Sequence, residues 1–141
     1  MKQFLKAFLA LHVAVYRLTG GRFGGSMRGF KVLLLTTTGR KTGKTRTLPL
    51  GFIEDKGTYV ICASNGGQDT HPSWYFNLMN QPAVTIEVMT QTIKATADIT
   101  SGAERKRLWD ALMAEAPAYR DYETSTTREI PMVVLRPITQ V

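Results

Sequence analysis

The sequence has little of what holds small secreted or metal-bound proteins together. Its 141 residues include a single cysteine, Cys62, which cannot form an intramolecular disulfide, and no Cys/His cluster has the spacing of zinc ligands. Glycine and proline are scattered rather than massed, and 43% of the residues are apolar, which excludes a fibrous or disordered chain. We therefore expect one globular domain over residues 1–141 in a reducing compartment, the cytoplasm.

Acidic residues are missing from the first third of the chain. Residues 1–50 contain ten Lys or Arg and no Asp or Glu, whereas all eleven acidic residues lie in residues 51–141. This distribution indicates an anionic partner for the N-terminal third: nucleic acid, an acidic lipid surface, or a small ligand with phosphate or carboxylate groups. The alternative is that these are ordinary solvated surface charges.

Residues 1–19 predict an N-terminal amphipathic helix that ends before Gly20. One face is apolar, with Phe4, Phe8, Leu11 and Val15. The uncharged stretch of residues 7–16 is shorter than the roughly 20 residues that span a bilayer. We expect the helix to pack on the domain or to cap a barrel, with peripheral contact of residues 2–18 at the inner membrane face as the alternative.

Short apolar segments separated by tight turns predict the rest of the fold. Strands are expected over residues 32–38, 46–54, 58–64, 84–88, 92–99 and 132–135. Helices are expected over residues 71–80 and 101–116, the second opened by a capping box of Ser101 and Glu104. Because the strands do not alternate regularly with helices, we expect an α+β fold in which an antiparallel sheet curls into a small barrel with rim helices.

The turn Gly39–Thr45 (GRKTGKT) is the most distinctive charged segment. A nucleotide-binding P-loop needs four residues between its glycines, and this turn has three. The two glycines and the basic side chains around them nevertheless predict an anion cradle in which backbone amides converge. No catalytic triad, carboxylate pair or metal signature supports hydrolase chemistry, so we expect no metal and a reaction that comes from a bound cofactor.

Several sequence blocks follow one another in a distinctive order and spacing: LLLTTTGRKTG (33–43), RTLPL (46–50), ASNGG (63–67), HPSWYFNL (71–78), NQP (80–82) and R-x-I-P-x-V-V-L (128–135). In order and spacing these blocks resemble the deazaflavin-dependent nitroreductase family of actinobacteria. The resemblance implies a split β-barrel, related to flavin reductases and pyridoxamine oxidases, of about six mainly antiparallel strands. It also implies binding of reduced coenzyme F420, a deazaflavin with a phosphate and an oligoglutamate tail, and hydride transfer from it to a small-molecule acceptor.

The same resemblance implies the site residues. The phosphate and carboxylates would lie on Arg40, Lys41, Thr42 and Arg46. The other cofactor-binding positions match family segments that line the ring and its ribityl chain: Thr47, Leu48, Pro49, Leu50, Gly51, Cys62, Ala63, Ser64, Asn65, Ser73, Trp74, Tyr75, Phe76 and Asn77. Ser64, Tyr119 and Tyr122 match catalytic positions that face the substrate, where a hydroxyl can polarise a carbonyl or donate a proton.

Two small residues depart from the family pattern. Gly51 and Ala116 stand where nitroimidazole-reducing relatives tend to have tyrosines. We therefore expect a wider pocket and an activated alkene, an enone or a quinone as acceptor, rather than a bulky nitro compound.

Two other functions are compatible with the same barrel. An FMN-dependent oxidoreductase with the same barrel and a non-catalytic F420-binding protein remain alternatives, because the fold does not fix the ring or the turnover. We expect no binding to nucleic acid, since the basic residues 22–46 are interleaved with only two aromatic residues, Phe23 and Phe30, on which bases could stack. We also expect a monomer.

Overall fold

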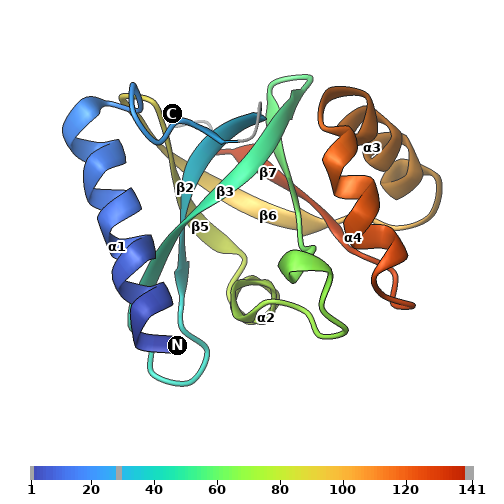
Figure 1. The fold of residues 1–141 in the computed structure, drawn as a ribbon, viewed down its shortest axis with the longest axis horizontal. Helices are drawn as coiled ribbons and strands as arrows, with labels where there is room; N and C mark the ends of the chain where they lie inside the picture. The colour runs from blue at the N-terminus through green and yellow to red at the C-terminus, as the bar shows by residue number, and fades with distance from the viewer. Residues whose placement is uncertain (1, 28–29, 139–141) are drawn as a thin grey trace.

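The computed structural model describes residues 2–27 and 30–138. The strands are β1 (Ser26–Met27), β2 (Phe30–Thr38), β3 (Thr45–Asp55), β4 (Thr58–Cys62), β5 (Ala83–Val88), β6 (Gln91–Ile99) and β7 (Met132–Pro137). The helices are α1 (Lys2–Thr19), η1 (Asn65–Gly67), α2 (Ser73–Asn80), α3 (Gly102–Glu115), η2 (Pro117–Tyr119) and α4 (Arg120–Thr124). Figure 1 shows the strands crossing at the centre, with α1 on one side, α3 and α4 on the other, and α2 below.

Within these residues the sheet closes on itself. Its strands follow the order β1-β2-β3-β4-β7-β6-β5, every pairing is antiparallel, and β2 also pairs with β5. Strands β2 to β7 therefore form a closed six-stranded barrel, to which the two-residue β1 adds an edge. The predicted antiparallel barrel with an N-terminal helix and rim helices is confirmed, and closure removes the open sheet edges that would otherwise invite aggregation.

Strand alternation produces two apolar layers. Side chains at every second position, such as Leu33 and Leu35, fill the barrel interior together with residues of α2. The intervening positions of β3, β4 and β7, such as Val60 and Val134, face outward and are covered by α3 and the segment after it. Because both faces of β3, β4 and β7 are packed, this part of the barrel is rigid.

Helix α1 is attached to the barrel near its C-terminal end. Val13 and Tyr16 are buried and form a small cluster with Leu34 on the outer face of β2. The Tyr16 hydroxyl donates to the Glu87 carbonyl (3.2 Å), and Arg17 forms an ion pair with the Glu87 carboxylate (2.8 Å). These contacts fix the helix beside β2 and β5.

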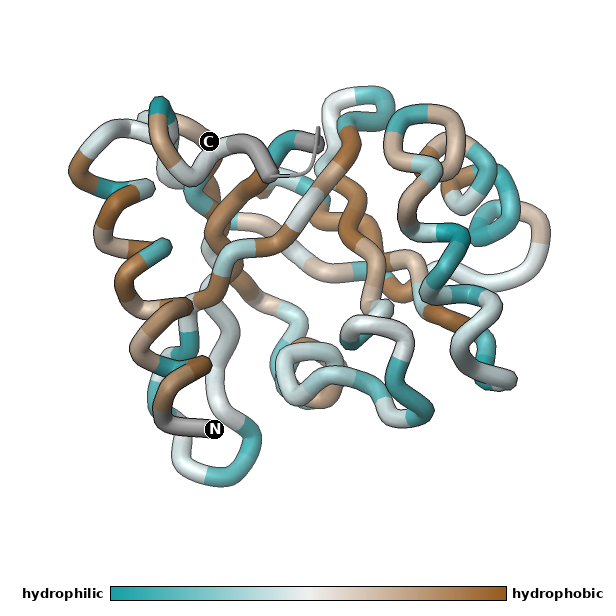
Figure 2. The backbone as a smooth tube through the Cα atoms, viewed as in Figure 1, coloured by the Kyte–Doolittle hydropathy of each residue, from teal (hydrophilic) through white to brown (hydrophobic). Residues whose placement is uncertain are grey.

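The apolar face read from the sequence of α1 points away from the barrel. Phe4, Phe8 and Leu11 are 82%, 57% and 62% exposed, although they are the residues that the helical periodicity groups into a hydrophobic stripe. Figure 2 shows hydrophobic residues along the whole of α1. The helix packs on the barrel through the opposite side instead, where Val13 and Tyr16 meet Leu34 and where α1 lies against β3. No helix among residues 2–27 and 30–138 is long and apolar enough to cross a membrane.

Three local expectations are corrected. The segment between the predicted helix 1–19 and the predicted strand 32–38 contains the short strand β1, where no strand was predicted. Strand β4 ends at Cys62 rather than at residue 64, because the backbone is already helical at Ser64 (φ −72°, ψ −29°) and left-handed at Asn65 (φ 49°). The capping box at Ser101 does not form: its side chain makes no cap hydrogen bond, and Glu104 is held by Arg107 (2.8 Å) instead.

Candidate active site

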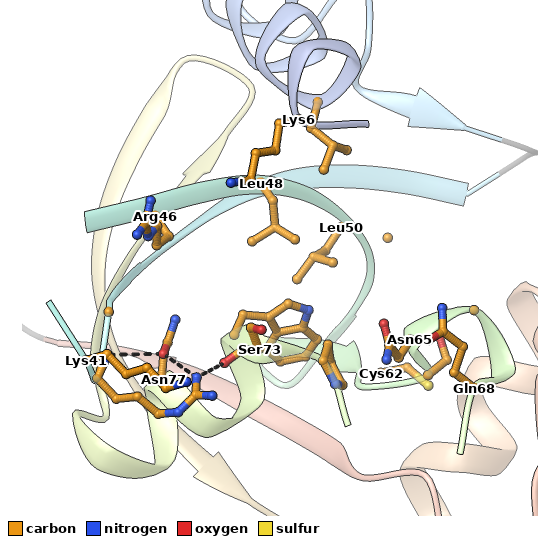
Figure 3. A pocket seen from close by; sticks show the side chains of 18 of the residues that line it. Lys6, Lys41, Arg46, Leu48, Leu50, Cys62, Asn65, Gln68, Ser73 and Asn77 are labelled. Carbon is orange, nitrogen blue, oxygen red and sulfur yellow. Dashed lines mark hydrogen bonds between the residues drawn. The ribbon is translucent and has the colours of Figure 1, made fainter. Parts of the chain in front are cut away.

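A cavity of about 800 Å³ opens at one end of the barrel. Its walls come from the β2–β3 turn, β3, the segment after β4, α2, η2 and the N-terminal half of α1. Figure 3 shows Lys41, Arg46 and Asn77 at one end of the cavity, Cys62, Asn65 and Gln68 at the other, and Leu48 and Leu50 between them. The cavity thus has a basic end, an apolar middle and a polar end.

The four residues predicted to hold the cofactor's anionic groups line the basic end. Arg40 and Lys41 come from the β2–β3 turn with Thr42, and Arg46 from the start of β3. None of the described residues that line the cavity is an Asp or a Glu. The side chains of Lys41 and Arg46 form no hydrogen bond or ion pair with any other residue in the described part of the chain. Their charge is therefore available to a ligand.

Arg40 is held in place by α2. Its guanidinium donates to the Asn77 side-chain oxygen (2.9 Å) and to the Ser73 carbonyl (3.2 Å), and it lies over the Phe76 ring at 5.2 Å from the centroid. Asn77 is buried, and its amide nitrogen donates to Thr37 (3.4 Å). An arginine fixed in this way loses less side-chain entropy when an anion binds.

Four backbone amides of the expected anion cradle are bonded within the protein. The Gly39 amide donates to the Lys44 carbonyl (2.7 Å) and the Gly43 amide to the Gly39 carbonyl (2.8 Å). The Arg40 amide donates to the Asn77 side chain (3.2 Å) and the Lys44 amide to the Thr42 hydroxyl (3.2 Å). These bonds close the hairpin turn, so an anion there would meet mainly the basic side chains and not the amides of the two glycines.

Strand β3 lines the cavity with every second residue. Arg46, Leu48 and Leu50 face the cavity, and Gly51 follows them at its wall. Thr47 and Pro49 lie on the other face of the strand, where the Thr47 hydroxyl bonds with that of Thr36 across the β2–β3 pair (2.7 Å). The two-residue period of a strand accounts for this division.

Helix α2 divides its predicted site residues in the same way. Ser73, Trp74 and Asn77 line the cavity from adjoining positions of the helix surface. Tyr75 packs against His71 instead, with ring centroids 4.5 Å apart, and Phe76 supports Arg40 from outside.

The polar end contains the predicted catalytic groups. Cys62, Ser64, Asn65 and Tyr119 line it, whereas Ala63 is fully buried in the barrel core. Burial raises the pKa of the Cys62 thiol to about 12, so this thiol is neutral. Burial also raises the pKa of Tyr119 well above its usual range, which keeps the phenol protonated as a hydrogen-bond donor. Tyr122 does not line the cavity; it packs edge-to-face on Tyr119, with centroids 5.4 Å apart.

Arg128 fixes the turn that forms this polar end. Its guanidinium donates to the carbonyls of Ser64 (2.9 Å), Gln68 (2.9 Å) and Ala63 (3.2 Å), and to His71 Nδ1 (2.9 Å). Burial, followed by the Arg128 charge, lowers the pKa of His71, which favours the neutral imidazole that this contact requires. In the sequence, Arg128 was noted only as the first residue of the block 128–135. Its structural role could not be predicted, because the residues that it contacts lie about sixty positions earlier in the chain.

Six lining residues were not predicted from the sequence. They are Lys6, Leu9, Gly39, Gly66, Gln68 and Pro72. The last four adjoin predicted segments and could have been found by extending them, but no local signal connects α1 with this cavity. Of the two small residues expected to widen the pocket, Gly51 lines it, whereas Ala116 is buried among the side chains beneath α3.

Comparison with known sequences identifies the family. The sequence profile described as F420H2-dependent quinone reductase matches residues 8–137 of the chain. The chain belongs to this family. Its members are oxidoreductases whose cofactor is reduced F420. An F420H2-dependent quinone reductase of Mycobacterium tuberculosis is 40% identical over 131 residues, which is 90% of this chain and 88% of the relative.

Solved structures agree with the family assignment. An F420H2-dependent reductase termed FDR-A is 38% identical, with a TM-score of 0.70, over 77% of this chain and 95% of its own. A structure described as a domain-swapped dimer is 32% identical, with a TM-score of 0.72, over 96% of this chain and 98% of its own. A pyridoxamine 5′-phosphate oxidase-like protein of Listeria innocua, at 12% identity and a TM-score of 0.54, shares the split-barrel fold alone.

Proposed function

We propose that the cavity binds reduced F420 with its phosphate and carboxylates at the basic end, and that the chain reduces a quinone beside Ser64 and Tyr119. The observation that carries this proposal is that one cavity of about 800 Å³ has basic side chains without acidic partners at one end and neutral hydroxyl groups at the other, with apolar side chains between them. Quinones suit such a site because they combine an apolar ring with carbonyl acceptors.

The basic end fits the acidic part of the cofactor. Arg40, already fixed by Asn77 and Ser73, would form charge-assisted hydrogen bonds to anionic oxygens, and Lys41 and Arg46 would add charge beside it. Thr42 would add a hydroxyl donor at the same turn. These side chains need not leave an acidic partner to bind the ligand, so binding is not opposed by a broken ion pair.

The rest of the cavity positions the reaction. When bound, reduced F420 supplies the hydride. Leu48, Leu50 and Trp74 would flank the ring and exclude water from it. The Tyr119 phenol, kept neutral by burial, would donate a hydrogen bond to the quinone oxygen on which negative charge develops, and Ser64 would act beside it. Tyr122 would hold the Tyr119 ring in place.

Binding and turnover test this function directly. We expect the purified chain to change the fluorescence of F420 at low concentrations and to leave FMN unaffected. Reduced F420 should then be oxidised faster with menadione than with cyclohexenone or a nitroimidazole. Preference for FMN would overturn the cofactor assignment, and F420 binding without oxidation by any acceptor would identify a binding protein instead.

The tyrosine roles are tested by a matched pair of variants. Tyr119→Phe is expected to lower kcat with menadione by about tenfold to a hundredfold and to leave the Kd for F420 unchanged, because the developing oxyanion loses a hydrogen-bond donor and the ring stays in place. Tyr122→Phe keeps the ring that packs on Tyr119 and should change kcat far less. Equal losses in the two variants would contradict the assignment.

We also propose that the exposed face of α1 contacts an anionic bilayer surface. Phe4, Phe8 and Leu11 are exposed together, and no acidic residue lies in the surrounding residues 1–50. Apolar side chains combined with basic charge are typical of helices that bind the lipid interface.

Vesicle sedimentation tests the bilayer contact. The chain should sediment with phosphatidylglycerol vesicles and remain in solution with phosphatidylcholine, and Phe8→Gln should weaken sedimentation without changing light-scattering mass. The expected mass is that of a monomer. A dimer that ignores vesicles would mean that a second copy covers α1, and the bilayer contact would be wrong.

A further inference from the structure

We propose that Lys6 of α1 binds the anionic part of F420, which makes the N-terminal helix a wall of the cofactor site. This inference rests on the proposed function and deepens it. It adds a residue that lies outside every sequence block by which the site was located, on a helix that is not part of the barrel.

Lys6 lies on the side of α1 that packs on the barrel. Leu9, Val13 and Tyr16 follow it at helical spacing, and these three are half-buried or buried. A lysine at such a position would ordinarily meet apolar side chains. Here the N-terminal half of α1 extends over the cavity, and Lys6 and Leu9 line that cavity instead.

The Lys6 side chain is directed to the basic end. Figure 3 shows it descending from α1 toward Leu48, with its amine on the side of Arg46. Leu48 and Arg46 are alternate residues of β3 that line the same cavity. Lys6 therefore faces the turn that carries Arg40 and Lys41 from the opposite wall, and a ligand between the two walls would be held from both sides.

The positive charges around the cavity have no acidic side chain beside them in its lining, which favours the binding of an anion. Lys6, Arg40, Lys41 and Arg46 line it, none of its described lining residues is acidic, and Lys6 has no hydrogen bond or ion pair with another described residue. On the same helix, Arg17 is paired with Glu87 at 2.8 Å. Like charges that share a cavity repel one another, and a bound polyanion would turn this repulsion into attraction.

Two groups of the ligand share the required chemistry, the phosphate and the glutamate carboxylates. Three probes separate them: F420 with its oligoglutamate tail, the same molecule without glutamates, and the deazaflavin with only its ribityl chain. Binding is followed by ring fluorescence over a series of salt concentrations, so the readout does not depend on activity.

Lys6→Ala is expected to raise the Kd for tailed F420 by about threefold to tenfold and to reduce the salt dependence of binding. The Kd for the ribityl compound should stay the same, and Lys6→Arg should restore binding. The molecule without glutamates assigns the partner: a loss equal to that of tailed F420 assigns the phosphate, and a smaller loss assigns the carboxylates. Lys106→Ala, on α3 and paired with Asp110 (3.1 Å), is the control for one lost positive charge.

Two results would overturn the inference. One is an unchanged Kd for tailed F420 in Lys6→Ala, and the other is an equal loss for all three probes, which would indicate that the wall as a whole had moved. The proposed function fails separately, if the unmodified chain binds none of the probes. If Lys41→Ala weakens tailed F420 and Lys6→Ala does not, the site stands and only the role of α1 is wrong.

Discussion

The basic side chains near α3 differ from those at the cavity in one respect, which is the presence of acidic partners. Arg107 pairs with Asp55 (2.9 Å) and with Glu104 (2.8 Å), and Lys106 pairs with Asp110 (3.1 Å). Lys41 and Arg46 at the cavity have no such partner among the described residues. Exposed pairs such as those of α3 contribute little to stability. The binding site is therefore distinguished by the absence of acidic neighbours around its basic side chains, more than by the number of basic side chains.

Giving the cavity an acid should abolish this contrast. Thr42→Glu places a carboxylate at the turn beside Arg40 and Lys41, where it would pair with the basic side chains and repel the ligand. We expect the Kd for F420 to rise by about a hundredfold, measured by ring fluorescence. Thr42→Gln, of nearly the same shape, should have a much smaller effect, and an equal loss in both variants would show that shape at the turn is what matters.

The same truncation in the two regions should have opposite consequences. Lys41→Ala is expected to weaken F420 binding by about tenfold and to flatten its salt dependence, because a phosphate or carboxylate loses a charged partner. Lys106→Ala removes the same charge from α3 and should leave the Kd unchanged. Titrations at low and high salt measure both variants, and an equal response would mean that net charge alone attracts the ligand.

Removing the central base of the α3 group should give the smallest effect. The Arg107 guanidinium lowers the pKa of Asp55 and of Glu104, so their ionised forms stabilise the folded chain above the ordinary carboxyl pKa. That contribution is lost as the pH falls through the lowered values. Arg107→Ala should therefore lower the urea midpoint slightly at about pH 7 and leave it unchanged in strong acid, with F420 binding intact. A difference that persists in acid would point to lost packing instead.

Local sequence patterns were sufficient for the barrel. The alternation of Ile93, Ala95 and Ala97 places β6 correctly, and all three belong to the apolar interior. The tight turn expected between the strands 46–54 and 58–64 is formed by Lys56 (φ 51°) and Gly57 (φ 81°), both left-handed, between Asp55 and Thr58. These features depend on neighbours within a few residues, which one sequence displays directly.

The packing of α1 and the composition of the cavity depend on distant contacts. Helical periodicity groups Phe4, Phe8 and Leu11 on one face but does not say whether that face is buried, because the barrel surface beside the helix comes from the distant strands β2, β3 and β5. The family resemblance assigned residues 46–51 to the site as one block. In a strand, however, alternate side chains point to opposite faces, so Thr47 and Pro49 face away from the cavity. The unpaired state of Lys41 and Arg46 is a property of the folded chain alone.

Strand β2 carries the basic turn at its end and is bonded on both edges, to β3 over Val32–Thr38 and to β5 over Leu34–Thr36. Amides in the doubly bonded stretch would exchange with deuterium only when the barrel opens as a whole. A ligand that binds only the folded chain makes this opening rarer, so its departure would speed exchange at these positions by a factor set by the lost binding free energy. Exchange around Thr42, which needs only a local opening of the turn, would report on contacts at the turn itself.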